Sequence, residues 1–251
     1  MTAKWGWKHC ILCAIPVAAG LGALVFADPF PQPPSYHDFA DKRPLAGIPN
    51  FGDLSSNLTF LVPGVLGLGL CLRRQPDGAF RAWRVFFAGF VLVTFGSGYY
   101  HWAPSNATLF WDRLAMAITF TALYTALLAE HVEPRLEKLL PAIVLVGVAT
   151  LLYWRWVDDL RFYFALQATV FTSALVMLLG FAHAFGQKRY LVAALACYTA
   201  AIGFDFFDAA VFQATGGLIS GHTIKHLMAA IAGSWGYLML RARAEGAAGR
   251  A

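Results

Sequence analysis

The chain has 251 residues, of which 59% are hydrophobic, 15% are aromatic and only 13% are charged. Soluble domains carry about 25% charged residues, so this composition excludes an ordinary water-soluble domain. The formal net charge of +5 comes from basic residues spread along the chain and not gathered in one patch, so it gives no indication of a nucleic-acid-binding surface.

Eight apolar runs follow one another along the chain. They cover residues 11–27, 54–72, 85–100, 109–129, 139–153, 162–185, 190–212 and 223–240. Clusters of Pro, Gly and charged residues separate them, as is typical of the connections between helices. A helix needs about 20 mostly apolar residues to cross a membrane. The runs therefore predict an all-α fold, a polytopic membrane helical bundle.

The first apolar run allows two interpretations. Its basic start, its short apolar core and the small residues before Asp28 are typical of a secretory signal, but also of a retained transmembrane helix. We expect residues 1–27 to be such a transmembrane helix or signal segment. Residues 28–251 then form one domain with a seven-helix core.

The basic residues predict the orientation, because Lys and Arg prefer short cytoplasmic loops. With the N-terminus inside, thirteen of the nineteen Lys and Arg residues lie on the cytoplasmic side. The C-terminus is then cytoplasmic as well. We expect a bacterial inner membrane, with the ends of the third and fourth runs that meet near residue 105 on the periplasmic side.

Polar residues gather at that outer side. Ser97 and His101 are four residues apart and share one helix face. After a short turn, Ser105 or Asn106 is suited to cap the next helix, which places Asp112 in its first turns. A charged residue at such a depth is costly to insert and is a functional candidate.

The last apolar run opens with SGHTIKH, in which His222 and His226 are also four residues apart. This spacing directs two imidazole rings towards one metal ion. His101 lies at the same membrane depth, and three histidines with an open fourth position are typical of catalytic zinc. The alternative for each histidine alone is an ordinary boundary residue.

These motifs carry a resemblance. The segment SGYYHWAPSNATLFWDRLAM and the later GHTIKH resemble the alkaline ceramidase family, part of a superfamily of seven-helix membrane hydrolases. The resemblance implies a zinc ion held by His101, His222 and His226. It also implies that Asp112 and Ser97 serve the chemistry, namely hydrolysis of ceramide or a related N-acyl lipid to a sphingoid base and a free fatty acid.

Several alternatives stay open at the level of sequence. Receptors of the progestin and adiponectin type belong to the same superfamily, so a non-enzymatic receptor or sensor with a structural zinc site is the competing function. The oligomeric state is undetermined. Asp205 and Asp208 are expected either to orient a metal-bound histidine or to form a structural ion pair, with Lys225 as the partner.

A second ion is implied for the outer loop. Asp38, Asp41 and Asn50 offer the oxygen ligands that calcium prefers, and animal alkaline ceramidases resemble this region in carrying a calcium site. Basic residues lie among the acidic ones and the spacing differs from the family pattern, so a solvated loop with helix-capping residues is the alternative.

Overall fold

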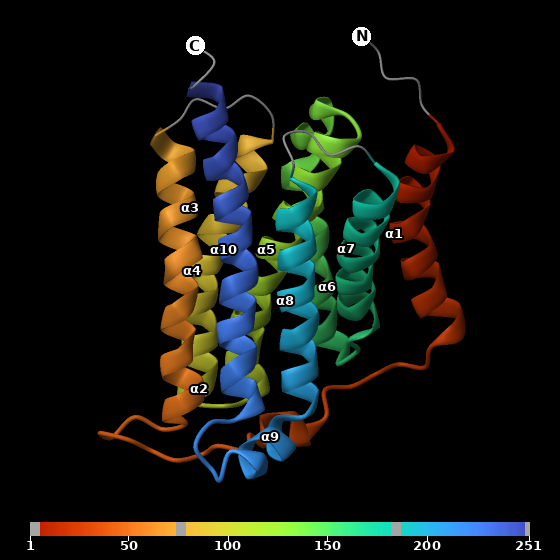
Figure 1. Ribbon diagram of the computed structural model, residues 1–251. Helices are drawn as coiled ribbons and strands as arrows, with labels where there is room; N and C mark the ends of the chain where they lie inside the picture. The colour runs from red at the N-terminus through yellow and green to blue at the C-terminus, as the bar shows by residue number, and fades with distance from the viewer. Residues whose placement is uncertain (1–5, 74–78, 182–186, 249–251) are drawn as a thin grey trace. The chain divides into compact units, whose positions relative to one another are not determined.

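The computed structural model of the protein describes residues 6–73, 79–181 and 187–248. Apart from one antiparallel bridge between Leu45 and Ile48, the secondary structure of these residues is helical. The fold is therefore all-α, as the composition predicted. The elements shown in Figure 1 are α1 (Trp7–Phe26), η1 (Pro34–His37), α2 (Phe51–Ser56), η2 (Asn57–Phe60), α3 (Leu61–Arg73), α4 (Phe80–Trp102), α5 (Asn106–His131), η3 (Pro134–Leu139), α6 (Leu140–Val157), α7 (Arg161–Gly180), α8 (Lys188–Phe206), α9 (Asp208–Ala214) and α10 (Gly221–Ala248).

Six helical stretches of the described chain are long and apolar enough to cross a membrane: Phe51–Arg73, Phe80–Trp102, Asn106–His131, Pro134–Val157, Arg161–Gly180 and Lys188–Phe206. The protein is a multi-pass integral membrane protein. A shorter apolar helix covers Cys10–Phe26. The predicted last span lies in α10, which is 28 residues long but less apolar than the six, because two histidines and Lys225 occur near its start and three charged residues near its end.

The predicted run 190–212 is interrupted. Helix α8 ends at Phe206, and α9 begins at Asp208 after a residue with φ −100° and ψ 27°. The start of α10 lies against this break so closely that a Cβ atom on Gly221 would be 2.1 Å from the carbonyl oxygen of Phe204. The break brings Asp208 within hydrogen-bonding distance of the start of α10.

One compact unit of the chain comprises residues 1–33, 75–86 and 117–183. Within it, α7 packs against both α1 and α6. The buried carboxylate of Asp159 organises the segment before α7. It accepts hydrogen bonds from the backbone N–H of Phe30 (3.2 Å) and from the N–H (3.0 Å) and guanidinium (2.9 Å) of Arg161.

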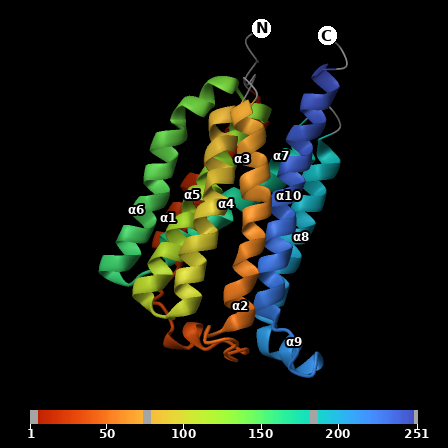
Figure 2. The same cartoon turned by 90° about the vertical axis from the view of Figure 1, so that its left-hand side faces the viewer.

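The second compact unit comprises residues 34–74, 87–116 and 184–251. It contains all the residues predicted from the sequence to bind metal or to take part in catalysis. In both views α10 lies between α3 and α8, and it packs against both (Figure 1, Figure 2). The end of α4 and the start of α5 approach closely, because Gly96 leaves no side chain between the backbones. A Cβ atom there would be 2.6 Å from the carbonyl oxygen of Trp111.

Serine hydroxyl groups cap α5, which carries Asp112, and α10, which carries two of the three histidines. Ser105 caps α5, since its hydroxyl accepts a hydrogen bond from the N–H of Thr108 at 3.2 Å. Ser220 caps α10 in the same way, through the N–H of Thr223 at 3.0 Å. The Ser105 cap confirms one of the two predicted for this helix.

Candidate metal centre

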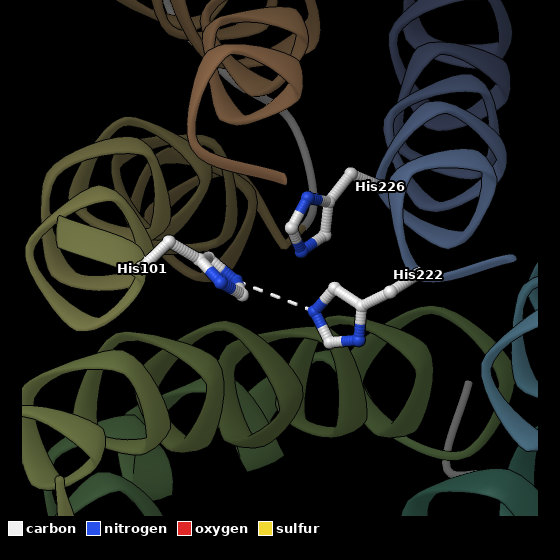
Figure 3. Close-up of side chains that lie close together, drawn as sticks. All are labelled: His101, His222 and His226. Atoms are coloured by element: carbon white, nitrogen blue, oxygen red, sulfur yellow. Dashed lines mark hydrogen bonds between the residues drawn. The ribbon is translucent and has the colours of Figure 1, made fainter. Parts of the chain in front are cut away.

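Three buried histidines meet in the second unit. His101 comes from the last turn of α4, and His222 and His226 come from the first two turns of α10. One nitrogen from each ring lies within 4.8 Å of the others, and the residues are 1%, 5% and 3% exposed, respectively. Their side chains point towards one another (Figure 3). Among the described residues, this is the one cluster of His, Cys, Asp and Glu with metal-ligand spacing.

The distance between His101 and His222 and the donor set fit zinc. The Nε2 atoms of His101 and His222 are 3.3 Å apart (Figure 3). Two nitrogens at about 2.0–2.1 Å from a tetrahedral zinc ion are separated by about 3.3 Å. Imidazole is a preferred zinc ligand, and three protein ligands leave the fourth position open.

The outward nitrogens of two rings are bonded to protein. Nδ1 of His226 lies 2.7 Å from the hydroxyl of Ser56, and Nδ1 of His222 lies 2.8 Å from Oδ1 of Asp205. These contacts leave Nε2 of each ring for the cluster. Such outer partners fix the orientation of a metal-binding histidine. Nδ1 of His101 is buried and has no hydrogen-bond partner among the described residues.

Aromatic rings cover the histidines. Phe39, in the loop before α2, is buried, and its ring centroid is 4.8 Å from that of His101 and 4.9 Å from that of His222. On another side, the ring centroid of Phe60 lies 5.6 Å from that of His226. Neither residue could be recognised from the sequence, because an aromatic side chain in an aromatic-rich chain carries no distinctive signal.

Ser97 and Asp112 lie beside the cluster. Both are buried, and the Ser97 side chain hydrogen-bonds with the Asp112 carboxyl group. Asp112 also interacts electrostatically with Lys225 and with His222. The predicted convergence of α4, α5 and α10 is thus present in the structure. The guanidinium of Arg113 lies 5.2 Å from the centre of the Tyr36 ring, and its charge also interacts with Asp112.

A second acidic group ties α2 to α10. Asp53 is fully buried, and its Oδ1 accepts hydrogen bonds from the hydroxyls of Thr223 (2.6 Å) and Ser220 (3.0 Å). Asp208 reinforces the same helix start, since its Oδ1 accepts a hydrogen bond from the N–H of His222 at 2.8 Å. These carboxylates therefore help hold the first turn of α10, which carries the histidines.

The residues nominated for calcium have other partners. Asp38 is exposed and pairs with Lys42. Arg43 donates to both carboxylate oxygens of Asp41, at 2.8 and 2.7 Å, and this side-chain hydrogen bonding lowers the pKa of Asp41. Asn50 donates its amide N–H to the carbonyl oxygen of His101 at 2.8 Å. The structure therefore gives the calcium site no support.

His37, at the end of η1, does not join the cluster. Its Nδ1 lies 2.9 Å from the hydroxyl of Tyr100, and its Nε2 lies 2.9 Å from Oδ1 of Asn106. It joins η1 to the turn between α4 and α5. On the other side of Phe39, the backbone N–H of Ala40 donates a hydrogen bond to Oδ2 of Asp208 at 3.0 Å. The loop carrying Phe39 is thus held on both sides.

An all-α membrane protein with a buried three-histidine cluster, flanked by a serine and an aspartate, has the features expected of a membrane hydrolase that acts on lipids. A sequence model of the ceramidase family matches residues 48–244. The chain belongs to the ceramidase family, whose name implies an amidohydrolase acting on lipids. A comparison with individually curated proteins finds no match.

Proposed function

We propose that the protein is a zinc-dependent lipid amide hydrolase that cleaves ceramide, or a related N-acyl lipid, to a sphingoid base and a free fatty acid. The observation that carries this proposal is the cluster of His101, His222 and His226, buried in a membrane protein of the ceramidase family and adjacent to Asp112. The proposed reaction is the addition of water across the amide C–N bond.

His101, His222 and His226 would hold the zinc ion. Bound in this way, zinc supplies a Lewis acid that polarises a carbonyl group and lowers the pKa of a water ligand towards 7. The partners Ser56 and Asp205 keep two of the three rings oriented for this role.

Asp112 is the proposed proton carrier. Its carboxylate accepts a proton from the water that attacks the carbonyl carbon, and it returns that proton to the nitrogen as the C–N bond breaks. Ser97 holds the carboxylate through their hydrogen bond in the structure. Once Asp112 has accepted the proton, the Ser97 hydroxyl no longer has to donate to it, and we propose that the hydroxyl then donates to the carbonyl oxygen, on which negative charge develops.

The burial of the three histidines is suited to a lipid substrate. Phe39 and Phe60 shield the histidines, so bulk water is kept from the site while an acyl chain has apolar surroundings. The polar end of the lipid would stay near the loop that precedes α2. Ceramide satisfies these requirements, because an amide joins its apolar acyl chain to the polar, hydroxyl-bearing end of a sphingoid base.

The test is to measure zinc content and lipid hydrolysis on the same detergent-purified sample. We expect about one zinc per chain and release of fatty acid and sphingoid base from ceramide. Treatment with a chelator should remove the zinc and stop the hydrolysis. Zinc-loaded, folded protein that leaves ceramides and other N-acyl lipids intact would contradict the enzyme and favour the receptor-like alternative.

The proposed orientation places the site at the periplasmic face of a bacterial inner membrane. Helix α10 has 28 residues and spans about 42 Å at 1.5 Å per residue, so its last turn lies a membrane thickness away from His222. Single cysteines introduced at Ser35 and Glu245 should react with an impermeant thiol reagent from opposite sides. Labelling of both from one side would overturn the topology.

A further inference from the structure

The three histidines differ in what their outward nitrogens contact. Nδ1 of His226 meets the neutral hydroxyl of Ser56. Nδ1 of His222 instead faces two charged groups, Oδ1 of Asp205 at 2.8 Å and Nζ of Lys225 at 3.2 Å. The same Oδ1 atom lies 3.1 Å from Nζ of Lys225. The charged pair Asp205 and Lys225 can therefore determine which of the two ring nitrogens of His222 carries the proton.

Only one of the two contacts to Nδ1 can be a hydrogen bond at a time. An ammonium group can only donate, so a bond from Lys225 requires an unprotonated Nδ1. A carboxylate can only accept, so a bond to Asp205 requires a protonated Nδ1. The two neighbours consequently favour opposite tautomers of the neutral His222 ring.

The choice of tautomer decides whether His222 can bind a metal ion through the cluster. With the proton on Nδ1, the lone pair lies on Nε2, which is the atom that faces His101 at 3.3 Å. With the proton on Nε2, that atom cannot ligate. The tautomer that Asp205 stabilises is thus the one that can bind the metal, and the tautomer that Lys225 stabilises is not.

We infer that Asp205 is a positioning residue that selects the metal-binding tautomer of His222 and, by engaging Lys225 through the same oxygen, prevents the lysine from stabilising the other. This inference deepens the proposed function and depends on its metal site. Asp205 lies at the end of α8, and His222 and Lys225 lie in the first turns of α10, the helix that packs against α8. The His222 side chain is 7% exposed, and those of Lys225 and Asp205 are 22% and 36% exposed.

The inference predicts that substitution of Lys225 partly compensates for the loss of Asp205. Asp205→Leu removes the acceptor and leaves Lys225 free to donate to Nδ1, so zinc affinity should fall by about 10- to 100-fold, as when other outer partners of metal ligands are removed. In the double variant Asp205→Leu/Lys225→Met, neither tautomer is favoured by a charge. Its zinc affinity should therefore recover part of the loss. Lys225→Met alone should keep nearly the original affinity.

The direct test reads the tautomer in metal-free protein. Nitrogen NMR of the ¹⁵N-histidine-labelled chain in detergent distinguishes protonated from unprotonated ring nitrogens, and comparison with His222→Gln assigns the signals of His222. We expect a protonated Nδ1 in the original protein, a reversed pattern in Asp205→Leu, and the original pattern in Asp205→Asn, whose carbonyl oxygen can still accept. An unprotonated Nδ1 in the original protein would overturn the inference, even if no variant folded.

Zinc competition with a chromogenic chelator supplies the second readout. Glu245→Gln is the control. It removes a carboxylate from the exposed Arg241–Glu245 ion pair near the end of α10, so the zinc affinity of this variant should be unchanged. A purely structural ion pair would make the double variant as weak in zinc binding as Asp205→Leu or weaker, which contradicts our expectation. The tautomer measurement needs neither zinc nor turnover, so a failure of the proposed function would be distinguishable from a failure of this inference.

Discussion

The hydroxyl of Ser56 lies 2.7 Å from Nδ1 of His226, although 170 positions separate the two residues in the chain. The same hydroxyl donates to the carbonyl oxygen of Asp53 at 2.9 Å. It therefore accepts the Nδ1 proton of His226, leaving Nε2 as the atom that faces the cluster. This pair joins α2 to α10 at the candidate metal centre.

Ser56→Ala should weaken zinc binding by about tenfold, because it leaves the Nδ1–H of His226 buried without an acceptor. Ser55→Ala is the matched control, since within the described part of the chain the neighbouring hydroxyl hydrogen-bonds to the carbonyl oxygen of Gly52 alone, at 3.4 Å. Zinc affinity measured by chelator competition checks the prediction. Equal affinities in the two variants would show that Ser56 does not orient the ring.

Asp112→Asn should retain zinc and lose turnover. The amide keeps the size of the side chain and its contact with Ser97, but it cannot carry a proton, and general acid–base catalysis is worth about 10²- to 10⁴-fold in rate. Metal analysis and fatty-acid release on one preparation check both parts. Asp38→Asn, which alters an exposed carboxylate, serves as the control. Near-normal turnover in Asp112→Asn would refute its role as proton carrier.

Gly96→Ala should lower both stability and turnover. The added Cβ would lie 2.6 Å from the carbonyl oxygen of Trp111, so α4 and α5 must move apart at the point that places His101 and Asp112. Overpacking of this kind costs about 1–3 kcal/mol. Gly98→Ala is the matched control, because no described atom beyond its own stretch of helix backbone would lie within 4 Å of its Cβ. Similar thermal unfolding of both variants in detergent would contradict the prediction.

Acid should destabilise the protein through Asp159. Burial alone would raise the pKa of Asp159, but hydrogen bonds from the side chain and N–H of Arg161 and from the N–H of Phe30 outweigh burial and lower the pKa to about 2. A carboxyl group with a lowered pKa stabilises the fold above its unfolded pKa of 3.8, and this stabilisation is lost as the pH falls towards 2.

Asp159→Asn should accordingly be less stable than the original protein at pH 7, and the difference should shrink as the pH falls from 4 towards 2. Thermal unfolding temperatures measured at several pH values provide the check, with the exposed Asp28→Asn as the control. A difference between Asp159→Asn and the original protein that does not change with pH would show that the charge of Asp159 does not stabilise the fold.

The sequence by itself determined the features that depend on local periodicity. Apolar runs of about 20 residues predicted the spans, and the four-residue spacing of His222 and His226 placed both rings on one helix face, because a helix repeats every 3.6 residues. The same reasoning put His101 and Asp112 at one depth, on either side of a short turn. It also predicted a cap at Ser105 or Asn106, at the start of an apolar helix.

Only the tertiary structure decided which distant side chains meet. The fold places Ser56 against His226. The sequence left Asp205 between two roles, and the structure brings it to both His222 and Lys225. Carboxylates that looked suited to calcium pair with nearby basic residues instead. Periodicity describes each helix separately, whereas these contacts depend on how helices far apart in the chain pack together.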